Sequence, residues 1–156
     1  MKHAPWAYFV DEAASCRAGM VPAGTPQAGA LADDVAAGSL PTVGMLVPDL
    51  THDAHDGTLA TADQWLASWL RAVLAGPDFT SGRLAVVVTA DEDDTRSGNQ
   101  VLTVVVAPGV AGRVVSAPLT HYSLTGLLCQ VAGVPPLREA ATAPSFADAF
   151  GLRVAG

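Results

Sequence analysis

The chain has 156 residues, of which 50% are hydrophobic and 15% are charged. It has enough apolar material for one globular core, which excludes disorder along its whole length, and it is too short for two ordinary domains. Fifteen acidic residues against eight scattered basic ones give a net charge of -7. A nucleic-acid surface or a polybasic membrane anchor is not expected, because both need clustered positive charge.

No membrane span or export signal is expected in this chain. No apolar run approaches the roughly 18 residues of a span, and the opening residues lack the basic-then-apolar pattern of a signal peptide. The two cysteines, Cys16 and Cys129, match no metal-binding spacing. A disulfide, two free thiols and a bond to a partner are all compatible with the sequence, and free thiols are slightly favoured.

The first half of the chain predicts one strand and one long helix. Prolines and glycines interrupt residues 1–40, so we expect an irregular covering segment there with one short helix over residues 30–37. Thr42–Val47 is a compact apolar run, which predicts a buried strand that opens into a loop. Thr61–Ala75 has apolar residues at i, i+4 and i+8, which predicts an amphipathic crossover helix.

The second half predicts two further strands and a second helix. Arg83–Thr89 is β-branched and short enough for a strand buried on both faces, and the valine-rich Gln100–Ala107 is a third strand candidate. Leu119–Ala132 carries leucines on one side, which predicts a helix. We expect the tail, residues 144–156, to pack as a short helix or coil around Phe146.

A strand, a helix of about fifteen residues and a second strand form a βαβ unit, with parallel strands and a right-handed crossover. The predicted fold class is therefore α/β. The chain is expected to be a single domain over residues 1–156, with residues 1–40 as the cover and residues 41–156 as the core. Ligands of such sheets bind outside the carboxyl ends of the strands, where this chain has placed its acids and histidines.

The loop after the first predicted strand, residues 49–57, is dense in aspartate and histidine. It contains Asp49, His52, Asp53, His55 and Asp56. Carboxylate oxygen beside imidazole nitrogen suits Zn, Mn or Fe, and it also suits a phosphate site in which an imidazole serves the leaving group. A solvated turn is the alternative, since Asp and Gly favour turns and helix N-caps. The residues alone leave both interpretations open.

A run of four acids follows the second predicted strand. Surface runs of this kind are usually just solvated, but carboxylates at the end of a buried strand face the place where a cation would sit. Asp91 and Glu92 are nearest the strand end, whereas Asp93 and Asp94 are expected to face water. His121 stands in the opening turn of the last long helix, where capping or packing is the alternative to a role in chemistry.

Taken in order, these stretches resemble a family of metal-dependent phosphoesterases. It includes bacterial acid phosphatases and phosphatidylinositol-phosphate phosphatases, is related to phospholipase C, and is placed in the alkaline phosphatase superfamily. The resemblance runs nearly end to end, from Lys2 to Leu152. The matching stretches are Lys2–Phe9, with a His-x-Pro motif at His3 and Pro5, Val47–Gly57, Trp65-Leu66, Val87–Glu92 and Thr120–Leu124.

The resemblance implies a three-layer α/β/α fold with a partial sheet, and a divalent metal ion as cofactor. The residues that it implies as metal ligands are Asp91, Glu92, Asp53 and Asp56. The residues that it implies around the phosphate, where they bind metal or assist the leaving group, are His55, His121 and Asp53. Asp56 is also expected to support its loop, and Asp49 and His52 rank below all of these.

The resemblance further implies that the amino-terminal half of the family's chain has no counterpart here. That half carries an acidic ligand in a Glu-Asn pair and a Ser or Thr nucleophile; Ser39 and Thr58 are candidate hydroxyls only by proximity. The expected function is hydrolysis of a phosphate ester, either a small molecule or a phospholipid headgroup, in an extracytoplasmic location. The alternative is a non-catalytic metal- or phosphate-binding remnant that self-associates as a homo-oligomer.

Overall fold

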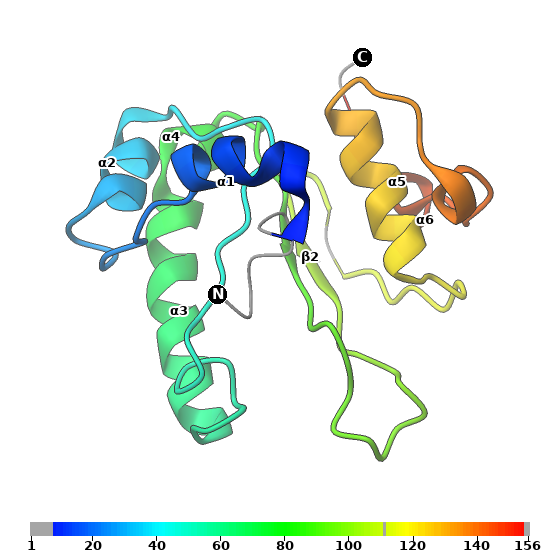
Figure 1. Cartoon of the computed structure of the whole chain (residues 1–156), viewed down its shortest axis with the longest axis horizontal. Coiled ribbons are helices and arrows are strands. Elements are labelled where there is room, and N and C mark those ends of the chain that lie inside the picture. Colours follow the sequence, from blue (N-terminus) through cyan, green and yellow to red (C-terminus); the bar gives the residue numbers. More distant parts are fainter. Residues whose placement is uncertain (1–7, 111, 155–156) are drawn as a thin grey trace. The chain divides into compact units, whose positions relative to one another are not determined.

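The computed structural model describes residues 8–110 and 112–154. These residues divide into two compact units (Figure 1). The first comprises the described residues up to Leu40 together with Gly44–Pro77. The second comprises Pro41–Val43 and the described residues from Asp78 onward.

The first unit is helical and is organised around one long helix. Its elements are η2 (Val10–Glu12), α1 (Ala13–Gly19), α2 (Ala30–Ala37) and α3 (Leu59–Ala75). The predicted helix over residues 30–37 is confirmed as α2, whereas α1 was not expected within the covering segment. α3 begins two residues before its predicted start because Thr58 caps it: the Thr58 Oγ1 accepts a hydrogen bond from the Thr61 amide at 3.1 Å.

α2 packs beside the carboxyl-terminal part of α3 (Figure 1). A Cβ placed on Gly76, directly after α3, would lie 3.0 Å from the Val35 Cγ1, so glycine permits this close approach. Trp69 is 2% exposed. The predicted apolar face of the helix is confirmed, since all its members are buried or half-buried: Trp65, Leu66, Trp69, Leu70, Val73 and Leu74.

The prediction of a buried strand over Thr42–Val47 is wrong. The segment has no regular secondary structure and makes no hydrogen bond within the described part of the chain. Its apolar side chains are exposed, including Met45 at 59% and Val47 at 39%. A strand is stabilised by backbone hydrogen bonds to a neighbouring strand. No strand in the described residues pairs with Thr42–Val47, so its β-branched composition alone does not make it a strand. The predicted βαβ unit is therefore absent from the described residues.

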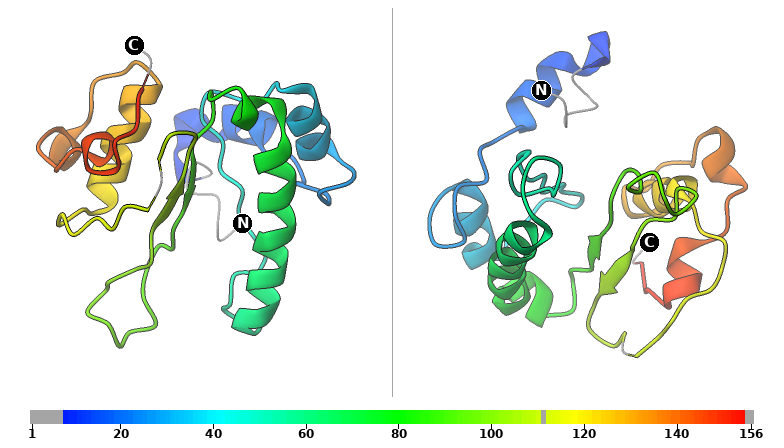
Figure 2. Two further views of the ribbon diagram at one scale, coloured as in Figure 1. Left: turned by 180° about the vertical axis from the view of Figure 1, so that it is seen from behind. Right: turned by 90° about the horizontal axis from the view of Figure 1, so that it is seen from below.

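The second unit combines one small sheet with helices. After α4 (Pro77–Thr80), strands β1 (Val86–Val88) and β2 (Val104–Val106) pair antiparallel, with Val87 opposite Val105. Both predicted strands exist, but they are shorter than predicted. The parallel pairing expected between Arg83–Thr89 and Thr42–Val47 is absent, because Thr42–Val47 forms no strand. Residues 89–103 form a long loop between them (Figure 2). The described chain thus contains both helix and sheet, which is compatible with the predicted α/β class.

The core of the second unit lies between its carboxyl-terminal helices and the sheet. The remaining elements are α5 (His121–Val131), η3 (Arg138–Ala141) and α6 (Phe146–Phe150), and α6 lies beside α5 (Figure 2). The helix predicted over Leu119–Ala132 is confirmed as α5, and the short helix predicted around Phe146 as α6. The core consists of Leu127, Phe146 and Ala147, with β-strand side chains packed against them from Val87 and Val105.

Cys16 and Cys129 are free thiols, the first buried and the second half-buried. Over residues 8–110 and 112–154, no helix is both long and apolar enough to cross a bilayer.

We predict that Trp69→Ala destabilises the first unit by about 3–5 kcal/mol, because it removes a large side chain from a closed packing site. Leu59→Ala, in the same helix but 77% exposed, is the matched control. It should change stability by less than about 0.5 kcal/mol. Urea unfolding followed by the helical circular dichroism signal measures both. Equal losses in the two variants would contradict the packing described for α3.

Candidate functional site

The candidate residues described by the structure lie in two loops, one in each unit, and at the start of α5. The His-Asp loop, residues 49–57, connects to the amino-terminal end of α3 in the first unit. The acidic loop, residues 91–99, follows β1 in the second unit. Each loop is built from local hydrogen bonds.

Asp49 opens the His-Asp loop and bonds to three groups through one oxygen. Its Oδ1 accepts hydrogen bonds from the Thr51 amide at 3.0 Å and the His52 amide at 3.1 Å, and it lies 2.6 Å from the His52 Nδ1. A carboxylate only accepts, so the Nδ1 carries the proton and the Nε2 is the available ring nitrogen. The bond from His52 lowers the pKa of Asp49, against a desolvation effect that raises it, and the two amides lower it further.

His55 occupies a second pair of the same kind. The His55 amide donates to the Asp53 Oδ1 at 2.8 Å, and the His55 Nδ1 donates to the Asp56 Oδ1 at 2.7 Å. The structure therefore brings together the three loop residues that the sequence ranked highest. The side chains of His55 and Asp56 are 67% and 61% exposed, so the available Nε2 of His55 is open to solvent.

The His-Asp loop is closed by its backbone. The Asp56 amide donates to the Leu50 carbonyl at 2.8 Å. A Cβ on Gly57 would lie only 1.8 Å from the Thr51 carbonyl oxygen, so only glycine fits where the two ends of the loop meet. Thr58 then caps α3, and its hydroxyl lies 2.9 Å from the Thr61 hydroxyl. This gives Thr58, named above as a candidate hydroxyl, a structural role.

Asp91 and Glu92 are exposed, and no side-chain partner is found for either carboxylate within the described residues. His121, the first residue of α5, contacts the residue that precedes Asp91 although it is distant in sequence: its Nε2 is 3.0 Å from the Ala90 carbonyl oxygen. A carbonyl only accepts, so the Nε2 donates and the Nδ1 is the available nitrogen. α5 starts at this point because the Thr120 amide donates to the buried Ser123 hydroxyl at 3.2 Å.

The prediction that Asp93 faces water is wrong. The carboxylate is half-buried and accepts three backbone amides, from Thr95 at 2.8 Å, Ser97 at 2.7 Å and Asn99 at 2.9 Å. Desolvation acts to raise the pKa of Asp93, but the three amides together lower it below its ordinary value. Asp94 is exposed, as expected. Asp93 therefore shapes the acidic loop, while Asp91 and Glu92 stay available.

The acidic loop supplies part of the ligand set that a divalent cation requires. Asp91 and Glu92 offer hard carboxylate oxygens without competing partners, as Mg²⁺, Ca²⁺ or Mn²⁺ requires. No group of three His, Cys, Asp or Glu side chains in residues 8–110 and 112–154 gathers closely enough to hold a metal ion. The second unit thus supplies two ligands rather than a complete set. His3 and Pro5 of the His-x-Pro motif lie outside the described residues.

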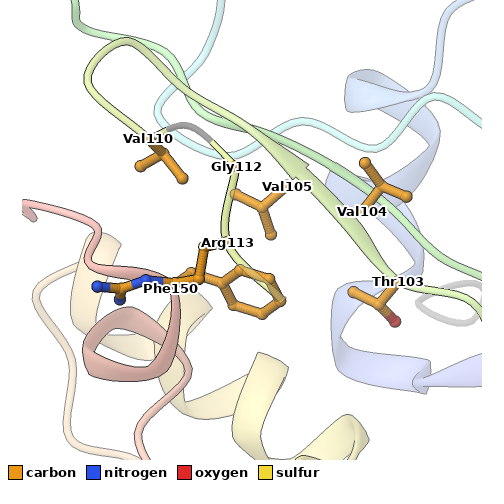
Figure 3. A pocket seen from close by; sticks show the side chains of 7 residues that line it. All are labelled: Thr103, Val104, Val105, Val110, Gly112, Arg113 and Phe150. Carbon is orange, nitrogen blue, oxygen red and sulfur yellow. The ribbon is translucent and has the colours of Figure 1, made fainter. Parts of the chain in front are cut away.

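A shallow pocket of about 190 Å³ lies elsewhere in the second unit (Figure 3). Its lining residues are Thr103, Val104, Val105, Val110, Gly112, Arg113 and Phe150. The Arg113 guanidinium donates to the Ala149 carbonyl at 3.1 Å and so contacts α6. No candidate residue lines this pocket, which sequence reasoning did not anticipate.

Comparison with known proteins settles the family. Residues 2–135 match the family model of the phosphoesterase family. The chain belongs to the phosphoesterase family. This confirms the resemblance that was indicated by the His-Asp loop, by Asp91 and Glu92, and by the Thr120–Ser123 stretch. No solved structure matches the chain at a significant level.

Several curated relatives carry phosphatase names. The chain is 36% identical over 112 residues to a phosphatidylinositol-3-phosphatase of Mycobacterium tuberculosis, covering 72% of this chain and 37% of that protein. It is 34% identical over 110 residues to a phosphate-repressible acid phosphatase of Penicillium chrysogenum and 29% identical over 110 residues to an acid phosphatase of Aspergillus fumigatus. These alignments each cover 67% of this chain, and they cover 26% and 24% of the two fungal proteins. The chain therefore spans about a quarter to somewhat over a third of these relatives.

We predict that Asp93→Ala disorders the acidic loop. The change removes the acceptor of three backbone amides, so amide hydrogen exchange at Ser97 and Asn99 should accelerate by about tenfold or more. Asp94→Ala is the control, because its carboxylate accepts only one amide, from Arg96 at 3.2 Å. Exchange at Ser97 that is the same in both variants would contradict the role given to Asp93.

Proposed function

We propose that this chain carries part of the active site of a metal-dependent, acid phosphatase-like enzyme that hydrolyses phosphate esters. Membership of the phosphoesterase family supports the reaction class. The observation that carries the site is the hydrogen bond of His121 to the Ala90 carbonyl, which brings an imidazole to the residue directly before Asp91 and Glu92. Imidazole and carboxylate together are suited to proton transfer and to cation binding, both of which phosphate-ester hydrolysis uses.

The proposal includes the architecture of the whole enzyme. We propose that residues 1–156 form a single domain equivalent to the carboxyl-terminal half of an alkaline phosphatase-like, three-layer α/β/α fold with a partial sheet. The share of the relatives that the chain spans supports this, since most of their length has no counterpart here. The nucleophilic Ser or Thr would belong to that other part.

In the acidic loop, Asp91 and Glu92 would hold the divalent ion. Such an ion, when bound, lowers the pKa of the attacking hydroxyl and offsets charge on the phosphate. The Nε2 of His121 donates to the Ala90 carbonyl, so the Nδ1 is the ring nitrogen that remains available. Its role would be to bind the phosphate or to assist the departing alkoxide.

In the His-Asp loop, His55 would protonate the leaving alkoxide. Asp56 accepts its Nδ1 proton and so fixes which nitrogen is available, leaving the Nε2 to donate. Asp53 accepts the His55 amide, and Asp53 and Asp56 are the metal ligands proposed in this loop. The nucleophilic Ser or Thr hydroxyl of the other part would attack phosphorus, and the alkoxide would leave with the proton from His55. Water would then hydrolyse the phospho-enzyme.

The substrate proposed is a phosphate ester, either a small molecule or a phospholipid headgroup; one relative is named a phosphatidylinositol-3-phosphatase and another an acid phosphatase. An extracytoplasmic location is part of the same proposal. The competing possibility is a remnant that binds metal or phosphate without turnover and self-associates. Metal-dependent stabilisation with no hydrolysis would favour that alternative.

We predict that Mn²⁺ or Mg²⁺ raises the unfolding temperature of the chain, and that the chain by itself is a poor catalyst of para-nitrophenyl phosphate hydrolysis because the proposed nucleophile belongs to the other part. A cation present at 100 times its Kd stabilises a folded chain by about 2.7 kcal/mol. Asp91→Ala and Glu92→Ala should each abolish that stabilisation and lower metal-dependent turnover by about tenfold or more, since each removes a charged ligand. Thermal unfolding and release of nitrophenol are the two measurements.

Asp94→Ala is the matched control for these variants, because it removes a carboxylate of the same loop that is exposed and ion-paired to Arg96 only at 3.9 Å. It should keep the response to metal. Stabilisation and turnover that survive in Asp91→Ala and Glu92→Ala would overturn the assignment of those two residues.

A further inference from the structure

Asp49 holds more of the His-Asp loop than any other residue in it. Its side chain accepts the Thr51 and His52 amides, and its carbonyl accepts the His52 and Asp53 amides, both at 2.9 Å. Three successive amides are therefore tied to one residue. Because Asp53 in turn accepts the His55 amide at 2.8 Å, the hydrogen bonds run without a break from Asp49 to His55.

His52 links this hydrogen-bonded turn to α3. Its Nδ1 donates to the Asp49 carboxylate at 2.6 Å, and its ring centroid lies 6.3 Å from that of Trp65 in α3, with the planes tilted by 33°. The His52 side chain is 35% exposed, compared with 67% for His55. His52 is thus the histidine that is held from two directions, by a carboxylate and by a helix, while His55 projects into solvent.

We propose that the Asp49–His52 pair is a positioning device that sets the placement of Asp53 and His55 relative to α3. The proposal rests on the proposed function, in which Asp53 and His55 face the phosphate. It gives a role to two residues that the sequence ranked lowest in the loop. Neither is proposed to touch the substrate; both act through the residues that follow them.

Because the Asp49–His52 pair is partly exposed, its positioning role can be distinguished from a contribution to the global stability of the chain. The Asp49 side chain is 69% exposed, and exposed hydrogen-bonded ion pairs contribute little to global stability. Such a pair controls the local order of the chain between its two residues. A turn that loses its carboxylate acceptor opens locally, and the core stays folded. Removing Asp49 should therefore loosen the loop and leave the packing of α3 unchanged.

The experiment compares Asp49→Ala with Asp49→Asn in the full chain. Asparagine keeps an oxygen that can accept from the same amides and from the His52 Nδ1, whereas alanine removes the acceptor. Asp63→Ala is the control, since it removes an exposed carboxylate from the first turns of α3 that accepts no hydrogen bond from the described residues of the loop. Amide hydrogen exchange of Asp53, His55 and Asp56, the unfolding temperature, and the NMR response of the His55 ring to inorganic phosphate are measured.

We expect exchange at His55 and Asp56 to accelerate by about tenfold or more in Asp49→Ala and by less than about twofold in Asp49→Asn and Asp63→Ala. The unfolding temperature should be equal in all four proteins. The His52 imidazole should lose its Nδ1–H tautomer preference in Asp49→Ala alone, as ¹⁵N shifts report. Weaker phosphate binding at His55 in Asp49→Ala, rescued in Asp49→Asn, would support the link to function.

Unchanged exchange at His55 and Asp56 in Asp49→Ala would overturn the proposal. So would acceleration spread across α3 with a lower unfolding temperature, because that pattern indicates general destabilisation. If the wild-type chain shows no response of His55 to phosphate, the proposed function fails, while the exchange data still decide whether the pair positions the loop.

Discussion

Aspartate carboxylates that accept backbone amide protons shape both loops of this protein. Asp49 and Asp53 do so in the His-Asp loop, and Asp93 does so in the acidic loop. A loop has no ladder or helix to satisfy its amides, so a carboxylate that accepts two or three of them replaces that support. The His52 side chain, together with the Thr51 and His52 amides, lowers the pKa of Asp49 against desolvation, and three amides lower the pKa of Asp93 against desolvation.

This use of some carboxylates determines which others are available for chemistry. In the acidic loop, Asp93 is committed to the backbone, and Asp91 and Glu92 are the acids without partners among the described residues. In the His-Asp loop, each histidine donates its Nδ1 proton to an aspartate, so each presents the Nε2. Local hydrogen bonds thus decide which acidic side chains support the backbone of a loop and which remain available to bind a ligand.

The helices place these loops. α3 starts at the end of the His-Asp loop through the Thr58 cap and is anchored by the buried Trp69. α5 starts at His121, and its packing on Phe146 and Val87 holds that end against the strand that leads into the acidic loop. The hydrogen bond from His121 to Ala90 is a consequence of this packing, because the two residues are separated by 31 positions.

The sequence by itself determined the helices, because their signals are local: α2, α3 and α5 follow from apolar periodicity and from capping threonines and glycines. It also determined the family and the composition of both loops. Only the tertiary structure decided strand formation and pairing, since Thr42–Val47 has the composition of a strand but no neighbour, and β1 and β2 pair antiparallel. It alone separated Asp93 from Asp91 and Glu92 and brought His121 to Ala90, because these outcomes depend on amides and carbonyls whose positions no side-chain pattern records.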